Sequence, residues 1–477
     1  ATGGTLRVAL NDGGTSETLN PLLLPTFMET ARASQLYDRL MQFTSDGKYS
    51  PWLAESIEPN ADATVWQVKL RDGVTFHDGK PFTADDVLWT LQLIADPASK
   101  SESAGQLEPV DLAATKKVSD TEIELHFKRP FGDVPALLSG KALLIVPDGM
   151  KGGWEKPNGT GPFTLGEWSA GRQTTLARNA DYWNGAAKVD TVVLQTIADP
   201  GQRTNALKAG QVDAIAFLDF VQAKALANDQ SLQLLRAKGS VCIPLYMEID
   251  ADPFKDVRVR QAFKLAVDRE QMVKNVLLGF GQVGNDVFGI TYPSYDASLP
   301  QRAYDPEKAK SLLKAAGLDG VKVTLYTSSS LAGMAESATA FKQQAKAAGI
   351  DVDLQKIPAD SYFANDKYLK VPFYQTNWGN SFESVVQDSM VKGAPYNETH
   401  WNDPAFEQAF RSAQGIADDA QRYAAYATLQ QQIWEQGGYI IWGFQELIDA
   451  YSPKVQGVQP NSLFNLGYFQ FKDWSLA

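Results

Sequence analysis

Residues 321–357 carry the pattern that most restricts the fold of this chain. Apolar residues alternate over 321–327, a helical pattern follows over 335–348, Gly349 ends it, and a second apolar strand fills 350–357. Two strands joined in this way run parallel, with the helix crossing over one face of their sheet. The second half of the chain therefore needs a parallel sheet that is covered by helices.

The first half of the chain shows strand patterns that favour antiparallel pairing. Apolar residues alternate over 64–70 and again over 74–76, across a short loop, which predicts a β-hairpin. A second hairpin is predicted over 163–178. Thr83 and Asp86 stand at capping-box spacing, which predicts that a helix begins there. Together with the later parallel unit, these patterns predict an α/β fold with mixed sheets.

Length and charge narrow the classes of protein to which the chain can belong. At roughly 100–200 residues per domain, 477 residues suggest two or three folding units. The formal net charge of −12 argues against a nucleic-acid partner, because phosphate contacts need clustered Lys and Arg. No uninterrupted apolar run approaches the ~18 residues that would suggest a membrane span.

Motifs for enzymatic chemistry are weak in this sequence. Cys242 is the only cysteine, which excludes an intrachain disulfide and any cysteine-based metal centre within one chain. The glycines of 279–284 have the spacing of a dinucleotide fingerprint, but a helical pattern precedes them where that motif needs a strand. The three histidines, His77, His126 and His400, leave little material for a metalloenzyme. We expect no catalytic residues, no cofactor and no metal site.

Several stretches together resemble a known family of binding proteins. The stretch W-Q-V-K-L-R-D-G-V-T-F-H-D-G-K-P-F-T-A-D-D-V at 66–87 is similar to the signature segment of the family 5 (peptide, nickel and opine type) solute-binding proteins of ABC importers. Further motifs match in the same order at 52–56, 159–163, 179–183, 257–270 and 304–310. The resemblance covers nearly the whole chain.

This resemblance implies a large, type II-like periplasmic-binding-protein fold with two lobes, a hinge between them and an extra inserted domain. The first lobe is expected at 1–40, 160–243 and 446–477, the inserted subdomain at 41–159, and the second lobe at 244–445. The two crossings between lobes are expected near 241–248 and 442–446. In such proteins the ligand contacts both lobes and stabilises a closed state that the importer recognises.

The ligand-binding residues are expected at strand ends and in loops near the crossings. The candidates are Thr15 and Ser16 after the first strand, Tyr246 and Met247 on the crossing strand, Trp378, Asn380, Phe382 and Glu383 in a polar loop, and His400 with Trp401 in a later loop. Trp378 is expected to pack on the ligand and Asn380 to hydrogen-bond it. Trp378 also fits a buried position in the core, and that alternative stays open.

The resemblance implies a short peptide or peptide-like solute, but one departure keeps other ligands open. Peptide-binding relatives hold the ammonium group of the ligand with an Asp where this chain has Asn380 and Ser381, and Glu383 is the nearest acid. A buried ammonium group needs a charged partner. If Glu383 does not reach the cleft, an opine, a metal-chelator complex or an oligosaccharide becomes an alternative. Trp378, Trp401 and Trp442 are candidates for stacking on sugar rings.

The partners and the location of the protein are also implied by the resemblance. We expect a monomer that delivers its solute to a permease and ATPase complex in the inner membrane. The chain starts at Ala1 without Met, and Cys242 is internal, which favours a periplasmic protein whose leader has been removed over a membrane-tethered lipoprotein. A secreted hydrolase and a ligand-sensing module remain alternatives from other functional classes.

Overall fold

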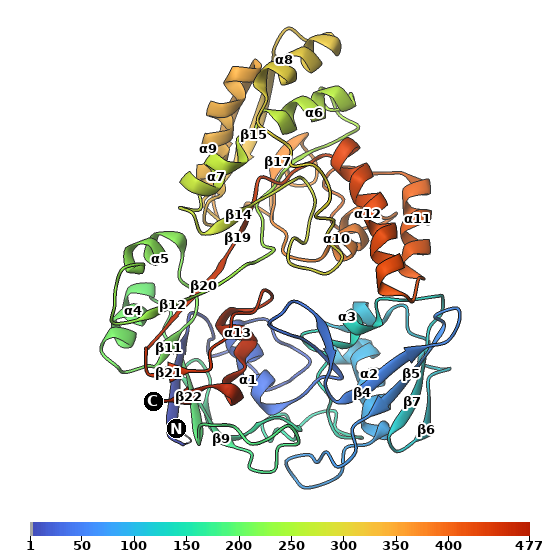
Figure 1. Ribbon diagram of the computed structural model, residues 1–477, viewed down its shortest axis with the longest axis vertical. Coiled ribbons are helices and arrows are strands. Elements are labelled where there is room, and N and C mark those ends of the chain that lie inside the picture. Colours follow the sequence, from blue (N-terminus) through green and yellow to red (C-terminus); the bar gives the residue numbers. More distant parts are fainter. Residues whose placement is uncertain (1–2) are drawn as a thin grey trace.

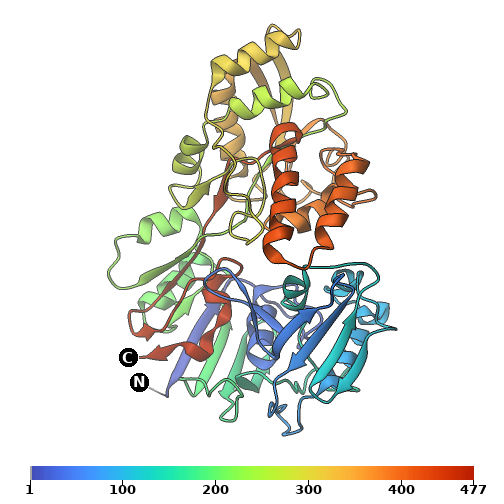
Figure 2. The ribbon, with the colours of Figure 1, turned by 45° about the vertical axis from the view of Figure 1, so that its right-hand side comes forward.

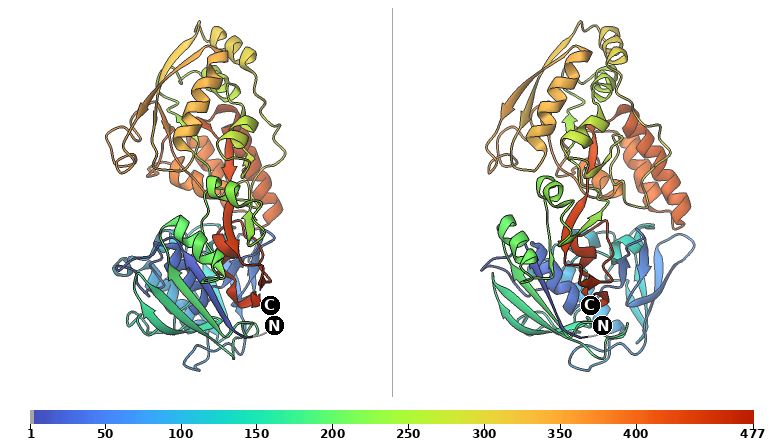
Figure 3. Two further views of the ribbon diagram at one scale, coloured as in Figure 1. Left: turned by 90° about the vertical axis from the view of Figure 1, so that its left-hand side faces the viewer. Right: turned by 60° about the vertical axis from the view of Figure 1, so that its left-hand side comes forward.

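The computed structural model describes residues 3–477 and has two lobes joined by two crossing segments (Figure 1). The first lobe and the inserted subdomain lie side by side in the lower half of the figure, and the second lobe lies above them. The described part of the chain begins and ends in the first lobe, as the side views confirm (Figure 3).

The first lobe is built on a seven-stranded sheet in the order β12-β20-β11-β1-β10-β9-β8. The strands are β1 (Thr5–Leu10), β8 (Phe163–Ser169), β9 (Gln173–Arg178), β10 (Thr191–Thr196), β11 (Ala214–Ile215), β12 (Gln233–Ala237) and β20 (Leu447–Tyr451). β1 runs parallel to β10 and β11, and the other pairs are antiparallel. Strands from each of the segments 1–40, 160–243 and 446–477 therefore share one sheet.

Short helices and a small β pair complete the first lobe. They are α1 (Phe27–Leu36), α4 (Pro200–Lys208), α5 (Phe220–Leu226), the left-handed turn α13 (Asn465–Phe469), the 3-10 helix η4 (Phe471–Asp473), and the pair β21 (Val455–Gln456) with β22 (Ser475–Leu476). Helix α1 begins with a capping box between Thr26 and Glu29. The hairpin expected over 163–178 is confirmed by the antiparallel pairing of β8 with β9.

The inserted subdomain carries a four-stranded antiparallel sheet in the order β4-β5-β7-β6. Its elements are β2 (Met41–Phe43) with β3 (Tyr49–Pro51), β4 (Ala54–Pro59), β5 (Val65–Leu70), α2 (Ala84–Ala95), η1 (Pro97–Ser99), η2 (Ala104–Leu107), β6 (Lys116–Ser119), β7 (Glu122–His126) and α3 (Val134–Leu138). The capping box that the sequence predicts is present, with the Thr83 amide donating to Oδ2 of Asp86 at 2.7 Å.

The hairpin expected between 64–70 and 74–76 is wrong. β5 pairs with β4 and β7, and Thr75 makes only an isolated bridge to Pro81. Val74 and Phe76 are buried because they pack into the core of the subdomain, so their alternation reflects packing instead of strand pairing.

The second lobe is built on a five-stranded sheet in the order β16-β15-β17-β13-β18. Its strands are β13 (Leu245–Met247), β15 (Val321–Thr327), β16 (Ile350–Lys356), β17 (Phe373–Gln375) and β18 (Tyr439–Ile440), and β14 (Gly281–Val283) pairs with β19 (Gly443–Gln445). The helices are α6 (Val257–Leu265), α7 (Arg269–Asn275), α8 (Pro306–Ala315), α9 (Met334–Ala345), η3 (Lys346–Ala348), α10 (Phe382–Ser389), α11 (Pro404–Gln414) and α12 (Asp419–Gln436). β15 and β16 run parallel with α9 between them, which confirms the expected parallel unit.

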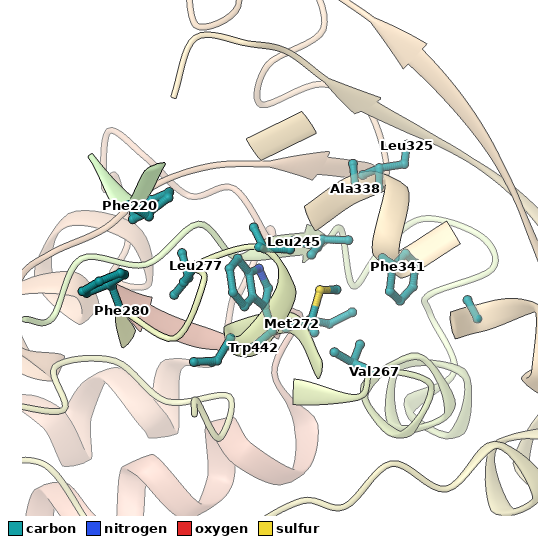
Figure 4. Close-up of a cluster of buried hydrophobic side chains, with 14 of the residues drawn as sticks. Phe220, Leu245, Val267, Met272, Leu277, Phe280, Leu325, Ala338, Phe341 and Trp442 are labelled. Carbon is teal, nitrogen blue, oxygen red and sulfur yellow. The ribbon is translucent and has the colours of Figure 1, made fainter. Parts of the chain in front are cut away.

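The lobes are joined where β12 leads into β13 and where β19 leads into β20. The two crossing segments contact each other, because the Gln445 amide donates to the Val241 carbonyl at 2.7 Å. Trp442 anchors the second segment: it is 1% exposed, and its indole NH donates to the Ile243 carbonyl at 2.8 Å. Figure 4 shows Trp442 near Leu277 and Met272 in the surrounding apolar cluster. Its burial excludes Trp442 from stacking on a sugar in this conformation.

Candidate functional site

A cavity of about 930 Å³ lies between the inserted subdomain and the second lobe. The subdomain contributes Gln106, Glu108, Arg129, Phe131 and Asp133, among others, and the second lobe contributes Tyr292, Asn380, Ser381, Glu383, Gln387 and Arg411. This volume is within the range of small-molecule binding sites.

The N-terminal end of α10 forms much of the second-lobe wall. Ser381 is the N-cap of this helix, and its side chain accepts a hydrogen bond from the Ser384 amide at 3.3 Å. Glu383 and Gln387, four residues apart on the helix, both line the cavity. Residues at this spacing lie on the same face of a helix, about 6 Å apart along its axis.

Glu383 is an acid without a basic partner. Its Oε2 accepts a hydrogen bond from Oγ of Ser294 at 2.6 Å, and within residues 3–477 no basic side chain forms an ion pair with it. Burial and the nearby negative charge of Asp133 raise the pKa of Glu383 to about 7. A cationic group placed in the cavity would stabilise the ionised form of Glu383.

Arg411 places a positive charge on the same wall of the cavity as the carboxyl group of Glu383. Its Nη1 donates to Oε1 of Gln387 at 2.6 Å and to Oε1 of Gln414 at 3.0 Å. No carboxylate in the described part of the chain forms an ion pair with it, whereas Arg129 across the cavity pairs with Glu108 at 2.8 Å. Burial lowers the pKa of Arg411, but an arginine keeps its charge in proteins.

The inserted subdomain touches the second lobe beside the cavity. Nε of Arg422 donates to Oδ1 of Asp133 at 2.6 Å, and the Tyr426 hydroxyl donates to Oδ2 of the same carboxylate at 2.5 Å. Next to this pair a Cβ at Gly132 would lie 1.9 Å from the Ile416 carbonyl oxygen, so only glycine fits. Figure 2 shows α12 reaching down to the subdomain at this point.

Trp378 lies beside the first crossing segment. Its backbone forms an isolated bridge with Cys242, in which the Cys242 amide donates to the Trp378 carbonyl at 2.8 Å. The side chain of Trp378 is half-buried, and Tyr292 donates to the carbonyl of the next residue, Gly379, at 3.3 Å. The loop that leads to Asn380 is therefore attached to the hinge region.

A buried carboxylate fixes the ring of Trp378. Glu398 is 0% exposed and accepts hydrogen bonds from the Trp378 indole at 3.0 Å, from the hydroxyls of Tyr368 and Tyr439 at 2.7 Å each, and from the Thr376 hydroxyl. Burial raises the pKa of Glu398, while these four donors oppose that rise. Because every donor converges on one group, the orientation of the indole is well determined.

The structure brings only part of the expected site together. Of the ten candidates, Asn380 and Glu383 line the cavity, and Trp378 lies two residues before Asn380. Thr15 and Ser16 are exposed on the loop after β1 in the first lobe.

The remaining candidates lie away from the cavity. Tyr246, Met247 and Phe382 are each 0% exposed and lie in the core of the second lobe. Tyr246 and Met247 are successive residues of β13 that point to opposite faces of the sheet, and each packs into a hydrophobic cluster of the second lobe. Trp401 is 5% exposed and packs on Phe406, and His400 contacts Asp250. These five side chains do not line the cavity.

Sequence reasoning missed two residues that line the cavity from opposite sides, Arg411 of the second lobe and Asp133 of the inserted subdomain. Arg411 lies on a helix whose pattern is that of an ordinary amphipathic surface helix, and Asp133 follows a turn with no special spacing. Neither residue carries a local signal, because both reach the cavity only through the packing of the second lobe against the subdomain.

No helix among the described residues has the length and apolar character that a membrane crossing requires.

Comparisons with known proteins agree with this architecture. The model of bacterial extracellular solute-binding proteins, family 5 middle region, matches residues 48–391. The glutathione-binding protein GsiB of Pectobacterium atrosepticum is 25% identical over 480 residues, covering 95% of this chain and 92% of the relative.

Two solved structures show the same fold. DppA of Helicobacter pylori in complex with the peptide STSA has a TM-score of 0.76 at 23% identity, covering 100% of this chain and 98% of that chain. The murein tripeptide binding protein MppA in its unliganded open form has a TM-score of 0.86 at 20% identity, covering 100% of this chain and 98% of that chain.

Proposed function

The chain belongs to family 5 of the bacterial extracellular solute-binding proteins, which bind solutes for ABC importers, and from this premise we propose that it captures a short peptide or peptide-like solute in the cavity described above. The role is one of binding and delivery, without covalent chemistry. The observation that carries the choice of solute is the presence of one unpaired carboxylate and one guanidinium without a carboxylate partner on the same wall.

The two charged groups suit a zwitterion. Glu383 would accept the ammonium group of the solute, and Arg411 would donate to its carboxylate. Gln387, which Arg411 of α11 contacts, lies one helical turn after Glu383 on α10, so the guanidinium lies against the helix face that carries the carboxylate. Asn380 would hydrogen-bond the backbone of the solute, and the fixed ring of Trp378 would pack on it. The glutathione-binding relative supports a peptide-like solute.

Hinge closure is the proposed mechanism. Thr15 and Ser16 lie exposed on the first lobe and would reach the solute when the lobes close. Contacts from both lobes would then stabilise the closed form, and a solute shifts this equilibrium only by its preference for that form.

The proposed location, oligomeric state and partners follow from this role in binding and delivery. We place the protein in the periplasm after removal of a leader, acting as a monomer that delivers its solute to the permease and ATPase complex of the inner membrane. The net charge of −12 favours solubility.

A binding screen tests the proposal. Native mass spectrometry of the purified protein, followed by denaturation, identifies a co-purified solute, and calorimetry then compares glutathione, short peptides, an opine, a nickel–histidine complex and an oligosaccharide. We expect a peptide-like zwitterion to bind, and E383Q and R411Q each to weaken it by tenfold or more, as expected for charged hydrogen bonds. E58Q, which removes an exposed carboxylate on β4, is the matched control. Binding of the uncharged oligosaccharide alone would contradict the proposal, as would binding unaffected by both variants.

A further inference from the structure

Three side chains that could hold a metal ion converge at the end of β13, outside the cavity. Glu248 and Asp250 follow this strand, and His400 comes from the loop before α11. One ligand atom from each lies within 4.8 Å of the other two. None of the three lines the cavity, so the cluster is separate from the proposed solute site.

Glu248 gives this cluster a buried carboxylate oxygen without a hydrogen bond. The residue is 4% exposed, and its Oε1 has no hydrogen-bond partner among the described residues. The nearest cationic group is Nε2 of His400, which lies 3.4 Å from Oε1. A buried carboxylate oxygen without a hydrogen bond is unfavourable. The carboxylate thus points to a missing partner.

The backbone holds His400 in place. His400 has a φ of 57°, a left-handed conformation that is uncommon for a residue other than glycine. The Ile249 amide donates to the carbonyl of Thr399 at 2.9 Å, which ties the His400 loop to the end of β13. Nδ1 of His400 lies 2.8 Å from Oδ1 of Asp250, so that carboxylate orients the ring. The strained backbone and the two contacts keep the imidazole directed at Glu248.

We propose that Oε1 of Glu248 and Nε2 of His400 bind a divalent first-row transition ion, with Zn²⁺ as the best fit, that Asp250 holds the imidazole through Nδ1, and that water completes the coordination. Two donors bound at about 2.1 Å to a tetrahedral Zn²⁺ lie roughly 3.4 Å apart, the separation of Oε1 and Nε2 here. A ligand set of one imidazole nitrogen and one carboxylate oxygen suits Zn²⁺ better than Ca²⁺ or Mg²⁺, which prefer oxygen ligands alone. The ion would link the loop of His400 to the central sheet.

The sequence alone predicts no metal site because His400 has no ligand neighbour in its own segment. Its carboxylate partner Asp250 is 150 residues away along the chain, and only the fold brings them together. No local sequence pattern therefore marks this site, because only tertiary contacts bring its residues together. The ion proposed here belongs to the second lobe and is not the transported solute.

Zinc binding by the full-length protein tests this proposal directly. The protein is stripped with a chelator, dialysed and titrated with Zn²⁺ in calorimetry, with Co²⁺ absorption as a spectroscopic readout of tetrahedral ligation. We expect one Zn²⁺ per chain, a rise in melting temperature with added Zn²⁺, and at least tenfold weaker binding in both E248Q and H400Q. H126Q is the control, because His126 also contacts a carboxylate, Glu124 at 3.3 Å, but without a buried unpaired oxygen.

Several results would overturn the site. If Zn²⁺ at 100 µM neither binds nor raises the melting temperature, the three residues form a simple ion-pair cluster with a protonated imidazole. If E248Q and H400Q bind Zn²⁺ as tightly as H126Q and the wild type, the ion sits elsewhere. Circular dichroism on each variant confirms that the fold is retained, and solute affinity measured in parallel keeps this test independent of the proposed function.

Discussion

Arg422 of the second lobe donates from Nε to Oδ1 of Asp133 in the inserted subdomain at 2.6 Å. This contact lies beside the cavity and is distinct from the hinge, where the two crossing segments join the lobes. Both side chains are largely buried, with exposed fractions of 2% and 10%. The second lobe is thus held at two places, and any closing motion pivots with this contact in place or has to break it.

Removing the arginine should be costly. In R422A the carboxylate of Asp133 stays buried with only the Tyr426 hydroxyl as a partner, and we expect unfolding free energy to fall by about 3–5 kcal/mol. Urea denaturation measures this. The double variant D133N/R422M removes both charges and should recover part of the loss. K310A, which removes an exposed pair with Glu307, should change stability by less than about 1 kcal/mol. Equal effects of R422A and K310A would contradict the importance of the contact.

Solute affinity should depend on pH through Glu383. Its pKa of about 7 means that the carboxyl group is mostly protonated at pH 6 and mostly ionised at pH 8. Since an ammonium group binds the ionised form, the dissociation constant should be about tenfold higher at pH 6 than at pH 8. Calorimetry at both values tests this, and E383Q should bind weakly with little pH dependence. A dissociation constant that is the same at both values in the wild type would remove Glu383 from the site.

A higher pH should lower the stability of the solute-free protein through Glu383, although it strengthens solute binding. The pKa of Glu383 in the folded protein is raised above its usual 4.5, so the fold favours the protonated carboxyl group. The contribution of this group to the free energy of unfolding is therefore fully present below pH 4.5 and is lost as the pH rises through about 7. We expect E383Q to be more stable than the wild type at pH 8, by about 3 kcal/mol, and equally stable at pH 4.5. Thermal melts at the two values measure the difference. An E383Q variant that is less stable at pH 8 would show that the ionised carboxylate is stabilised in the fold.

Trp378 and Glu398 should act together on the solute. W378A removes the proposed packing surface and should weaken binding by about 1–3 kcal/mol. E398Q keeps the ring but replaces one acceptor oxygen with a donor, so the indole loses its fixed orientation, and affinity should fall by a smaller amount. W434A, at a half-buried tryptophan of the same lobe that packs under Arg302, is the control and should leave affinity unchanged. An unchanged dissociation constant in W378A with the fold intact would return Trp378 to a purely structural role.

Local patterns in the sequence predict the elements whose causes are local. The parallel unit of β15, α9 and β16 follows from hydrophobic periodicity, and the start of α2 follows from the capping box of Thr83 and Asp86. The wrong prediction of a hairpin between 64–70 and 74–76 shows where local patterns stop being sufficient. β5 pairs instead with β4, a strand with exposed Glu55 and Glu58 and no apolar alternation.

The site was harder to predict because its residues come from distant segments. The resemblance pointed to the loop that carries Asn380 and Glu383, and both line the cavity. Tyr246 and Met247 lie on the crossing strand as expected, but both side chains pack into hydrophobic clusters of the second lobe, and the local sequence does not reveal that burial. Arg411 depends wholly on tertiary packing.

The central claim is that two lobes close on a solute held between them, and small-angle X-ray scattering tests it most directly. The protein is measured alone and with a saturating concentration of the solute identified by mass spectrometry. We predict a smaller radius of gyration and a shorter maximum dimension with the solute, and no change in E383Q at a concentration that saturates only the wild type. Identical scattering profiles of the wild type with and without bound solute would contradict hinge closure.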